Sequence, residues 1–464
     1  MRIEQLNGQR VAIWGCGREG QAALRALPSR LPSLPLTVLG SAAEREVWMA
    51  THATDAQFDL APVTLERLRG FDVVIKSPGI SPYRSPIPEA LAAGVQFISG
   101  SQLWFAEHAA ANTICITGTK GKSTTAALIA HLLRAQGVRT ALAGNIGLPL
   151  LELLDPASPP DWWVIELSSF QTRDAEAHPR IAVITNLIEE HLDWHGSVAR
   201  YHADKLALLA DVPQGIAVLN ADDPALRAWA DRPPLTECGK WFNDRRGWHC
   251  ADGAICFGDR AVMAIAELPL PGWHNASNVC AALTAVAAAG FDALAVVRHL
   301  SSFRALPHRL QALGARADID YVDDSIATTP QAAIAALDHY AERQVVMLIG
   351  GQDRGLDWQP FADRLAARPP RAVVCTGATR QRVSALLQQT LRAPTLSGVF
   401  AVESFEAAFL LAQSQTPTGG VLLLSPGAPS FGQFRDYVER GRRFAELAGF
   451  DPNQISDIAG LGIA

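Results

Sequence analysis

The stretch "ITGTKGKSTT" (residues 116–125) joins a strand-like run to a helix-like one. β-branched residues dominate "NTICIT" (112–117), and apolar residues at helical spacing follow from Lys122 to Gln136, where Gly137 is a plausible stop. The glycines between these runs therefore stand at a strand-to-helix turn, where backbone N–H groups and the helix dipole attract an anion. The pattern predicts one unit of a parallel α/β fold with a phosphate site at its turn.

The turn differs from the common phosphate loop, G-x-x-x-x-G-K-[ST], because Ile116 stands where the first glycine belongs. The loop is the shorter G-x-x-G-K-S-T, and the bland alternative is a glycine turn with a solvated lysine. Because strand, turn and helix occur in the required order, we favour phosphate binding, with Lys122 on the terminal phosphates and Ser123 or Thr124 on Mg²⁺. The loop residues predicted to bind the nucleotide are Gly118, Thr119, Lys120, Gly121, Lys122, Ser123 and Thr124.

Length and composition restrict the class of protein. A chain of 464 residues exceeds one ordinary core, which predicts several domains. The net charge of −6 argues against a nucleic-acid partner, which needs a basic face. No run of 18 apolar residues predicts a membrane span, and the N-terminus lacks the apolar core of a signal peptide. Seven cysteines without C-x-x-C spacing are typical of reduced thiols, so we expect a cytoplasmic enzyme.

Short apolar runs alternate with helical patterns along the whole chain, which predicts the fold class α/β with parallel sheets. We divide the chain into three segments, residues 1–99, 100–305 and 306–464. The expected strands are "RVAIWG", "LTVLG", "DVVIKS", "TICITG", "WWVIELS", "IAVITNL", "IAVLNA", "VVMLIGG", "AVVCTG" and "VLLLSPG".

The first segment carries a second glycine-rich turn, "GCGREG" (15–20), directly after a strand-like run. A NAD site also needs an acid at the end of the next strand, but that run ends in Gly40 and Ser41, and the nearest acid is Glu44. This weakens a NAD dehydrogenase interpretation. The glycines could hold the diphosphate of another nucleotide or only permit tight packing, and "KSPGIS" (76–81) offers a further turn at the same sheet edge.

The middle segment places polar residues just after strand-like runs. Glu166 ends "WWVIE", His191 follows "IAVITNL", and Lys205 lies further along in "YHADK". Taken singly they could be a buried ion-pair partner, a core histidine and a surface lysine. Open α/β sheets build sites at the carboxyl ends of strands, so together they suit magnesium binding, although histidine is an uncommon ligand for Mg²⁺.

Ten motifs in order resemble the Mur ligase family of ATP-dependent amino-acid ligases, over essentially the whole chain. "LPHR" together with "SPGAPSFGQF" resembles the glutamate-adding branch. The motifs are "GTKGKSTT", "GNIG" (144–147), "ELSSFQ" (166–171), "EEHLDWH", "YHADK", "HNASN" (274–278), "LPHRL" (306–310), "DDS" (323–325), "GGQDRG" (350–355) and "LLLSPGAPSFGQF".

The resemblance implies three domains: a Rossmann-like one (1–99) for the UDP-sugar, a central ATPase (100–305) and a Rossmann-like third domain (306–464). It implies that ATP phosphorylates the terminal carboxylate of UDP-N-acetylmuramoyl-L-alanine and that the amino group of glutamate attacks the acyl phosphate. Mg²⁺ is the implied metal. Lys205 matches a lysine that family members carbamylate, which would replace a cation with an anion beside the second metal.

The resemblance also implies roles for single residues. Lys122 would bind ATP phosphates, Ser123 or Thr124 with Glu166 would hold one Mg²⁺, and His191 would hold the second. The remaining positions are matched as follows: Asn278 to an adenine contact; Arg309 and Asp324 to ATP contacts; Gly17, Arg18 and Ser77 to the UDP-holding turns; Asn145 to a sugar-peptide contact; Arg354 to a cation facing the incoming glutamate; and Ser430, Phe431 and Tyr437 to the amino-acid pocket.

The chain departs from the family's pattern in three places, at "DSIATTP", at Lys120, and at "SPGAPS" (425–430), where relatives usually read "SPACAS" or similar. D-glutamate ligases usually read D-S-K-A-T-N where this chain has "DSIATTP" (324–330), so Ile326 replaces a cation and Pro330 restricts Thr329. Lys120 stands where relatives usually have a short residue. Either the pocket is intact, or it has been rebuilt for the other enantiomer. We favour L-glutamate over D-glutamate, which would require a separate epimerase if the wall contains the D form.

Two other interpretations remain. A folylpolyglutamate-synthetase-like ligase shares the short loop but predicts no UDP site, and a nucleotide switch protein would not need Glu166, His191 and Lys205. We expect a monomer. Because Arg309 and Asp324 are matched to contacts with ATP held by another domain, we also expect domain closure.

Overall fold

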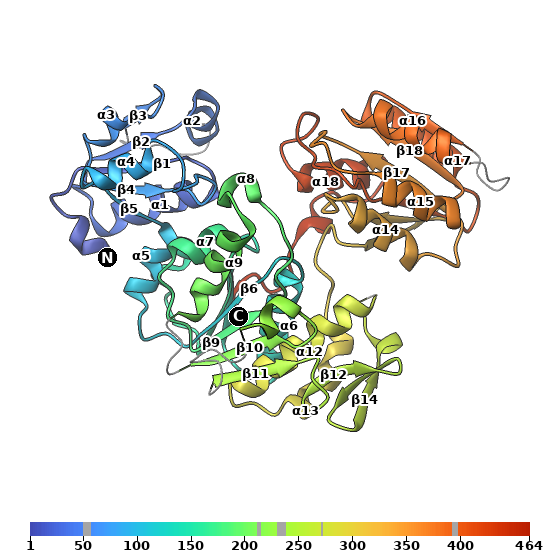
Figure 1. Ribbon diagram of the computed structural model, residues 1–464, viewed down its shortest axis with the longest axis horizontal. Helices are drawn as coiled ribbons and strands as arrows, with labels where there is room; N and C mark the ends of the chain where they lie inside the picture. Colours follow the sequence, from blue (N-terminus) through green and yellow to red (C-terminus); the bar gives the residue numbers. More distant parts are fainter. Residues whose placement is uncertain (50–56, 211–214, 230–237, 271, 392–397) are drawn as a thin grey trace. The chain divides into compact units, whose positions relative to one another are not determined.

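The computed structural model describes residues 1–49, 57–210, 215–229, 238–270, 272–391 and 398–464 (Figure 1). These residues form two compact units, one of residues 1–303 with 460–464 and the other of residues 304–459. The first unit contains the predicted first segment and the middle segment up to residue 303, and residues 304 and 305 lie in the second unit. Residues 460–464, which we had grouped with the third segment, lie in the first unit.

A five-stranded parallel sheet with the order β3-β2-β1-β4-β5 organises the start of the chain. Three predicted runs form its centre, and the short helices lie between the strands in sequence. Its strands are β1 (Val11–Trp14), β2 (Leu36–Leu39), β3 (Gln57–Asp59), β4 (Val73–Lys76) and β5 (Gln96–Ile98), and its helices are α1 (Arg18–Arg30), α2 (Ala42–Met49), α3 (Leu65–Leu68) and α4 (Ile87–Ala92), with η1 (Ile3–Leu6) before them. The order is that of a Rossmann-like half-sheet.

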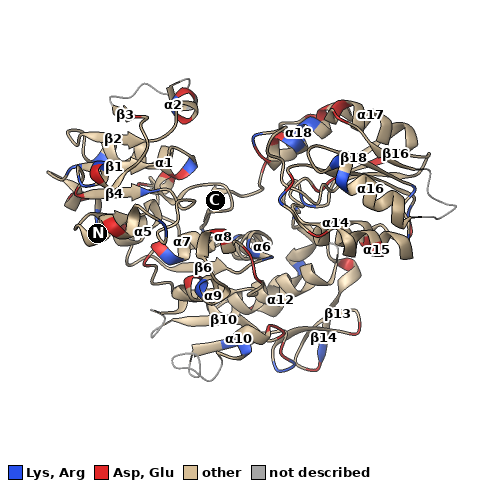
Figure 2. Ribbon diagram, turned by 45° about the horizontal axis from the view of Figure 1, so that its top comes forward, with Lys and Arg blue, Asp and Glu red and all other residues tan. Residues whose placement is uncertain are grey.

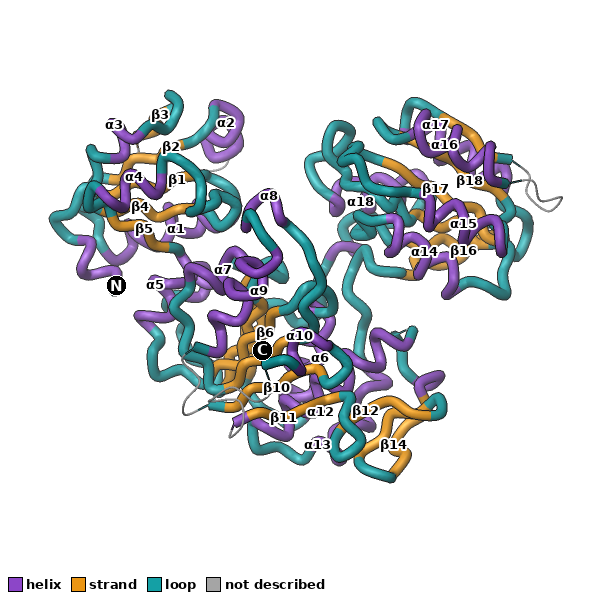
Figure 3. Tube along the Cα trace, viewed as in Figure 1, coloured by secondary structure: helices purple, strands orange, loops and turns teal. Residues whose placement is uncertain are grey.

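A seven-stranded sheet, β11-β10-β9-β6-β8-β7-β21, carries the phosphate loop (Figure 3). The strands are parallel except β21, which pairs antiparallel with β7. They are β6 (Thr113–Thr117), β7 (Thr140–Gly144), β8 (Trp162–Glu166), β9 (Ile181–Ile184), β10 (Ile216–Asn220), β11 (Gly239–Phe242) and β21 (Gly462–Ile463).

Helices and one small sheet accompany this central sheet. The small sheet is antiparallel, β12 (Trp248–Ala251), β13 (Ala254–Phe257) and β14 (Arg260–Ala264). The helices are α5 (Gly100–Glu107), α6 (Lys122–Ala135), α7 (Ser169–Asp174), α8 (Leu192–His195), α9 (Val198–Leu206), α10 (Pro224–Arg227), α12 (Trp273–Ala288) and α13 (Ala293–Val296), with η2 (Leu150–Leu153), η3 (Ala207–Leu209), η4 (Ile265–Glu267) and η5 (Val297–Ser302).

The second unit is built on a six-stranded sheet, β15-β16-β20-β17-β18-β19, parallel except for the β15–β16 hairpin. Its strands are β15 (Gln311–Arg316), β16 (Ile319–Asp323), β17 (Val345–Gly350), β18 (Ala372–Thr376), β19 (Val399–Ala401) and β20 (Val421–Leu424). Its helices are α14 (Pro330–His339), α15 (Gln359–Ala367), α16 (Arg380–Thr390), α17 (Phe405–Gln415) and α18 (Tyr437–Leu447), with η6 (Gln454–Ser456).

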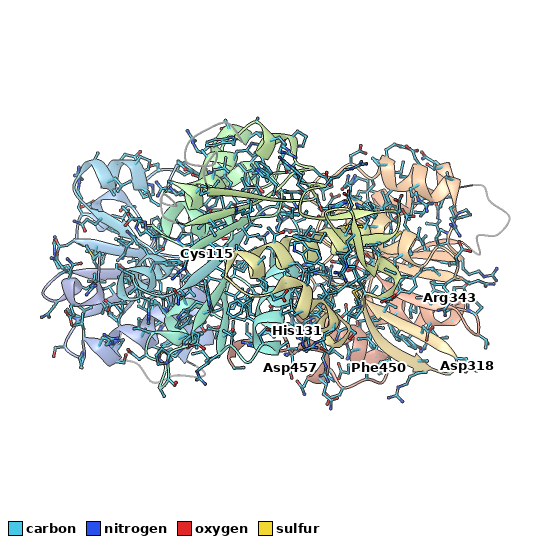
Figure 4. The ribbon with its side chains drawn as sticks, turned by 90° about the horizontal axis from the view of Figure 1, so that it is seen from below. Cys115, His131, Asp318, Arg343, Phe450 and Asp457 are labelled. Atoms are coloured by element: carbon cyan, nitrogen blue, oxygen red, sulfur yellow. The ribbon has the colours of Figure 1, made fainter. Side chains whose placement is uncertain are left out.

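Burial explains why the ten predicted runs became strands. Strands β6, β8, β9, β17, β18 and β20 are buried along their whole length. Cys115 on β6 lies in this interior (Figure 4). Helix α6 is also apolar on most of its surface, and its His131 donates from Nε2 to the His299 carbonyl at 2.8 Å. Apolar burial of these strands stabilises the seven-stranded and six-stranded sheets and positions the carboxyl ends of the strands.

Within the described residues, no helix is long and apolar enough to cross a membrane. Lys and Arg residues are interspersed with Asp and Glu along the ribbon in both units (Figure 2).

Candidate nucleotide and metal site

Two glycines allow the phosphate loop to turn as tightly as it does. Gly118 and Gly121 have φ of +140° and +84°, and Gly121 is the N-cap of α6. A Cβ on Gly118 would lie 2.0 Å from Thr185 Oγ1, and one on Gly121 would lie 2.3 Å from Asn278 Oδ1. Backbone angle and space thus both require glycine, as expected of a loop whose N–H groups face an anion.

Hydrogen bonds fix the shape of this loop. Thr119 donates from its backbone N–H to Asn186 O at 3.0 Å, and its hydroxyl lies 2.6 Å from Tyr201 Oη. Thr185 Oγ1 donates to Lys120 O at 2.6 Å, and Lys122 Nζ donates to Thr119 O at 2.9 Å. Lys122 therefore curls over the loop, at the position from which an ammonium reaches bound phosphates.

Lys120 is an exposed cation beside the loop. Its Nζ lies 2.8 Å from Glu190 Oε1, and its N–H donates to Asn186 Oδ1 at 2.9 Å. The lysine that replaces the usual short residue is thus paired with the acid next to His191.

Glu166 has the geometry of a cation ligand. It ends β8 with 1% exposure, and its Oε1 accepts from Asn145 Nδ2 at 2.8 Å. Its Oε2 is buried without a hydrogen-bond partner among the described atoms. A buried carboxylate oxygen without a partner is costly unless a cation completes it, so the residue fits Mg²⁺. Ser123 and Thr124 lie in the first turn of α6, and Thr124 is buried.

His191 lies at the N-cap of α8 in a left-handed conformation, with φ of +56°. Its ring meets Phe170 edge-on, with centroids 5.2 Å apart, and its Nε2 lies 3.8 Å from Glu190 Oε2. Burial, aided by Lys205 and Lys122, lowers the pKa of His191, while Glu190 opposes the shift. A neutral imidazole is the form that ligates metals.

Lys205 is buried on α9 and donates from Nζ to Gly118 O at 2.7 Å. Burial, and then the charge of Lys122, lowers the pKa of Lys205 well below 10.5, against the attraction of Glu190 and Glu166.

The four residues predicted to be catalytic are close enough to influence one another electrostatically. They are Lys122, Glu166, His191 and Lys205. No group of three or more His, Cys, Asp or Glu side chains suited to a metal occurs in the described part of the chain. Mg²⁺ bound to phosphate commonly needs only one or two protein ligands, so this fits.

Two asparagines predicted to bind substrates, Asn278 and Asn145, hydrogen-bond to residues of α6 and of β8. Asn278 on α12 is buried, with Oδ1 accepting from Thr125 Oγ1 at 3.5 Å. Asn145 follows β7 and joins it to β8, because its backbone N–H also donates to Glu166 O at 2.9 Å.

A pocket in the first unit brings the predicted UDP-holding residues together. Gly17, Arg18 and Ser77 line it with Asn145, and Gln171 contributes from α7. Further lining residues are Glu19, Pro78, Gly144, Gly147 and Pro149. The pocket thus extends from the glycine turn "GCGREG" to the end of β7, where Asn145 donates to Glu166.

Glu44 completes the glycine-rich turn in a way that the sequence did not reveal. Its carboxylate accepts from Cys16 N and Ser41 N, both at 2.8 Å. Burial raises the pKa of Glu44, but the hydrogen bonds from Ser41 and Cys16 lower it overall. The acid near the end of β2 therefore already binds the turn, which further weakens the NAD interpretation.

In the second unit, Arg309 and Asp324 lie near each other. Asp324 accepts from Leu310 N at 3.1 Å and from Ser425 Oγ at 2.7 Å. Burial raises the pKa of Asp324 to about 7, against the hydrogen bonds and the charge of Arg309. The Nε of Arg309 is buried without a partner among the described atoms.

The predicted amino-acid pocket residues also belong to the second unit. Arg354 lies over the ring of Phe431, 6.0 Å from its centroid. Ser430 is buried, and Tyr437 begins α18 and accepts at its carbonyl from Ser325 Oγ at 2.8 Å.

Sequence reasoning missed Arg440, which is buried and donates to Ser325 O at 2.8 Å and Ala428 O at 3.1 Å, joining the "DDS" and "SPGAPS" loops. Its position on an amphipathic helix gave no signal of this role.

Sequence reasoning also missed His195, a fully buried histidine four residues after His191. Its ring nitrogens lie 2.6 Å from Asp204 Oδ2 and 3.0 Å from Ser169 Oγ.

Two family models match the chain. "Mur ligase middle domain" covers residues 116–286, and "Mur ligase, glutamate ligase domain" covers residues 308–427. A protein of Xanthomonas euvesicatoria pv. vesicatoria is 51% identical over the full length of both chains, and one of Xylella fastidiosa is 50% identical, also over both full lengths. A Micromonospora protein is 40% identical over 96% of this chain and 98% of its own. All three are named UDP-N-acetylmuramoyl-L-alanine–L-glutamate ligase.

Solved structures share the fold. UDP-N-acetylmuramate-alanine ligase MurC from Thermotoga maritima matches with a TM-score of 0.61 and 18% identity, covering 95% of this chain and 99% of that one. An Acinetobacter baumannii ligase, named as acting on UDP-N-acetylmuramoylalanyl-D-glutamyl-2,6-diaminopimelate and D-alanyl-D-alanine, matches with a TM-score of 0.58 and 18% identity, covering 81% and 89%.

The two family models and the full-length relatives define the class of protein, an amide-bond-forming ligase. With relatives 50–51% identical over their entire length, the chain belongs to the Mur ligase family of ATP-dependent, amide-bond-forming ligases of peptidoglycan synthesis.

Proposed function

We propose that the enzyme joins L-glutamate to UDP-N-acetylmuramoyl-L-alanine in the cytoplasm, at the expense of ATP. The observation that carries this proposal is the shared name of the full-length relatives, which specifies both that nucleotide and L-glutamate. The replacement of a cation by Ile326, and Pro330 at the first position of α14, support it from the chain itself.

The reaction balances in two steps. The terminal carboxylate oxygen of the muramoyl nucleotide attacks the γ-phosphorus of ATP, and ADP leaves. The neutral amino group of glutamate then attacks the acyl-phosphate carbon, and inorganic phosphate leaves as the amide forms and the amine loses a proton. Catalysis here consists of alignment and of neutralising charge on the transferred phosphoryl group.

Each step has residues proposed for it. The loop N–H groups and Lys122 bind the terminal phosphates, and Asn278, Arg309 and Asp324 contact the rest of ATP. Mg²⁺, when bound, neutralises phosphate charge, and Ser123 or Thr124, Glu166 and His191 would hold it. The pocket with Gly17, Arg18 and Ser77 takes the UDP group, and Asn145 the lactoyl-peptide end. Arg354, Ser430, Phe431 and Tyr437 line the glutamate pocket.

Lys205 is proposed to carry a carbamate. The ammonium first loses one proton, and the neutral amine then adds to CO₂, forming an N–C bond and releasing a second proton. A cation is thereby replaced by an anion beside His191 and Glu166. The lowered pKa of Lys205, caused first by burial, supports the reaction because only the neutral amine adds to CO₂. The carbamate nitrogen keeps one N–H, which suits the acceptor at Gly118 O, 2.7 Å from Nζ.

The preference for L-glutamate follows from one missing charge. Ile326 is half-buried, and its backbone N–H donates to His308 O at 3.1 Å, which connects the loop of this apolar side chain to the "LPHRL" segment. A buried carboxylate without a partner costs about 1–3 kcal/mol, which is roughly 5- to 150-fold in the ratio of rates.

The test is ADP release and amide formation with purified enzyme, muramoyl nucleotide, Mg²⁺ and each glutamate enantiomer. We expect L-glutamate to exceed D-glutamate by at least about tenfold in kcat/KM. Ile326→Lys should lower that ratio. A clear preference of the unaltered enzyme for D-glutamate would replace the L-glutamate proposal with its D-glutamate alternative.

Three wider proposals accompany this reaction. We propose that the enzyme acts as a monomer and that a separate epimerase acts on the product's glutamyl centre where the wall contains the D form. We also propose that the two units close on ATP, because Arg309 and Asp324 of the second unit are matched to ATP contacts. Small-angle scattering with and without ATP and muramoyl nucleotide tests closure, and identical profiles would contradict it.

A further inference from the structure

Three short helices present the residues of the proposed metal site. Glu166 lies three residues before α7, His191 is the N-cap of α8, and Lys205 lies within α9. Helices of four to nine residues are too short to be stable alone. Their mutual arrangement must therefore be set by contacts between them.

One imidazole contacts all three of these helices. His195, at the end of α8, is fully buried, with Nδ1 2.6 Å from Asp204 Oδ2 on α9 and Nε2 3.0 Å from Ser169 Oγ on α7. A carboxylate only accepts hydrogen bonds, so Nδ1 donates to Asp204. Nε2 of the neutral ring then accepts from the Ser169 hydroxyl. His195 thereby joins α7, α8 and α9 through directed bonds.

Both carboxylate oxygens of Asp204 have hydrogen-bond partners. The second carboxylate oxygen of Asp204, Oδ1, accepts from Tyr83 Oη at 2.6 Å, and the Arg200 guanidinium lies over the Tyr83 ring at 4.4 Å. Tyr83 follows the "KSPGIS" turn of the UDP pocket. The rings of Phe170 and Tyr201 pack beside the imidazole, with centroids 5.5 Å and 5.1 Å from it. Fully satisfied buried polar networks of this kind are rigid and specify one arrangement.

The order Ser–His–Asp is also that of a nucleophile triad. Ser169 is only 3% exposed and His195 is fully buried, so no substrate carbonyl reaches the hydroxyl. The contacts connect helices that bear other functional residues, and they do not face a substrate.

We propose that His195 is a positioning residue for the metal site. Through Ser169 it fixes the start of α7 beside Glu166, through Asp204 it fixes α9 beside Lys205, and through its own helix it fixes His191. This inference rests on the metal site of the proposed function. Hydrogen-bond partners behind metal ligands commonly change metal affinity by 10- to 100-fold when they are removed.

The test uses full-length His195→Phe and His195→Gln with Mn²⁺ in place of Mg²⁺. Phe keeps the ring shape without hydrogen bonds, whereas Gln keeps a donor and an acceptor. We expect His195→Phe to weaken Mn²⁺ binding in the presence of ADP by at least about tenfold, measured by electron paramagnetic resonance. His195→Gln should recover part of that loss. A carbamate signal from ¹³C-labelled bicarbonate should also weaken in His195→Phe.

The matched control is His108→Phe. His108 is a partly buried histidine of the same unit that stacks on Trp104 at 4.5 Å and donates to Leu154 O at 2.9 Å. We expect it to lower the melting temperature without changing Mn²⁺ affinity. Mn²⁺ affinity of His195→Phe within twofold of the unaltered enzyme would overturn the proposal.

If His195→Phe does not fold, Ser169→Ala takes its place, because it removes one bond of the network and keeps the ring. We expect a threefold or larger loss of Mn²⁺ affinity, and an unchanged affinity would overturn the proposal. Failure of the proposed function is distinguishable. An unaltered enzyme that binds Mn²⁺ but does not ligate glutamate would contradict the substrate assignment, while the comparison of variants would still decide the role of His195.

Discussion

Burial, and then the charge of Lys122, lowers the pKa of Lys205 and favours its neutral amine, although Glu190 and Glu166 oppose the shift. We expect Lys205→Ala to lower kcat by about 10- to 100-fold, because the second metal loses its supporting anion. Depleting CO₂ should lower the activity of the unaltered enzyme, and bicarbonate should restore it. The measurement is phosphate release in degassed and bicarbonate-supplemented buffer.

Because only the neutral amine adds CO₂, recovery should be slower at lower pH. Lys240→Ala, which removes an exposed lysine on β11, is the control and should leave activity unchanged. Activity that does not depend on CO₂ in the unaltered enzyme would contradict the carbamate.

Asp324 makes the second unit sensitive to pH. Burial raises its pKa from 3.8 to about 7, so between these values the folded chain binds more protons than the unfolded chain. The contribution of Asp324 to the free energy of unfolding therefore falls by about 2–4 kcal/mol as the pH rises through this window. We expect Asp324→Asn to melt higher than the unaltered enzyme at pH 8 and close to it at pH 5, while binding ATP less tightly.

Asp320→Asn is the matched control for this prediction. Asp320 belongs to the same strand, β16, but is partly exposed in an ion pair with Arg343 at 2.6 Å. Loss of a surface pair changes stability by at most about 1 kcal/mol, with little difference between pH 5 and pH 8. Equal melting shifts for Asp324→Asn at both pH values would contradict the assignment.

At the scale of elements, the phosphate loop depends on glycine for two separable reasons, backbone angle and space. Gly118→Ala would cause both backbone strain and a steric clash, because φ is +140° and the Cβ would lie 2.0 Å from Thr185 Oγ1. Gly137→Ala would incur only strain, since its φ is +77° and nothing lies within 4 Å. We expect Gly137→Ala to cost about 1–2 kcal/mol of stability with ATP affinity unchanged.

Gly118→Ala should cost more stability and also lose at least tenfold in ATP affinity, measured by calorimetric titration. Equal ATP affinity in the two variants would show that the shape of this loop does not determine phosphate binding.

The elements also separate what the sequence could predict from what it could not. All ten expected strands occur, because an apolar run followed by Gly, Ser or Asn is a local signal, and α6 ends at Ala135 beside the expected stop at Gly137. The antiparallel strands β12–β14 were not predicted, because partly exposed strands of four and five residues are too short for the sequence pattern to distinguish them from loops. His195, Ser169 and Asp204 were missed because their separation in sequence carries no signal of contact.

At the scale of the whole molecule, the chain crosses between the two units twice, near residue 303 and near residue 459. After the second crossing, β21 adds an antiparallel edge to β7, with Thr140 N and Ala464 O 2.8 Å apart. Arg134 donates to Gly460 O at 2.6 Å and to Gly462 O at 2.9 Å. A two-residue strand is too short for sequence periodicity to reveal it, so only the fold identifies this attachment.

The attachment matters because β7 leads directly into Asn145, the residue that holds Glu166. Deleting residues 460–464 would expose the edge of β7 and leave Arg134 with only Thr140 O among these acceptors. We expect faster amide hydrogen exchange at Ala141 and Leu142 and a lower melting temperature of the first unit. Arg134→Met, which keeps the strand and removes the donors, should give a smaller change. Exchange in β7 that is unaffected by the deletion would mean that the buried parallel strands alone hold Asn145 in place.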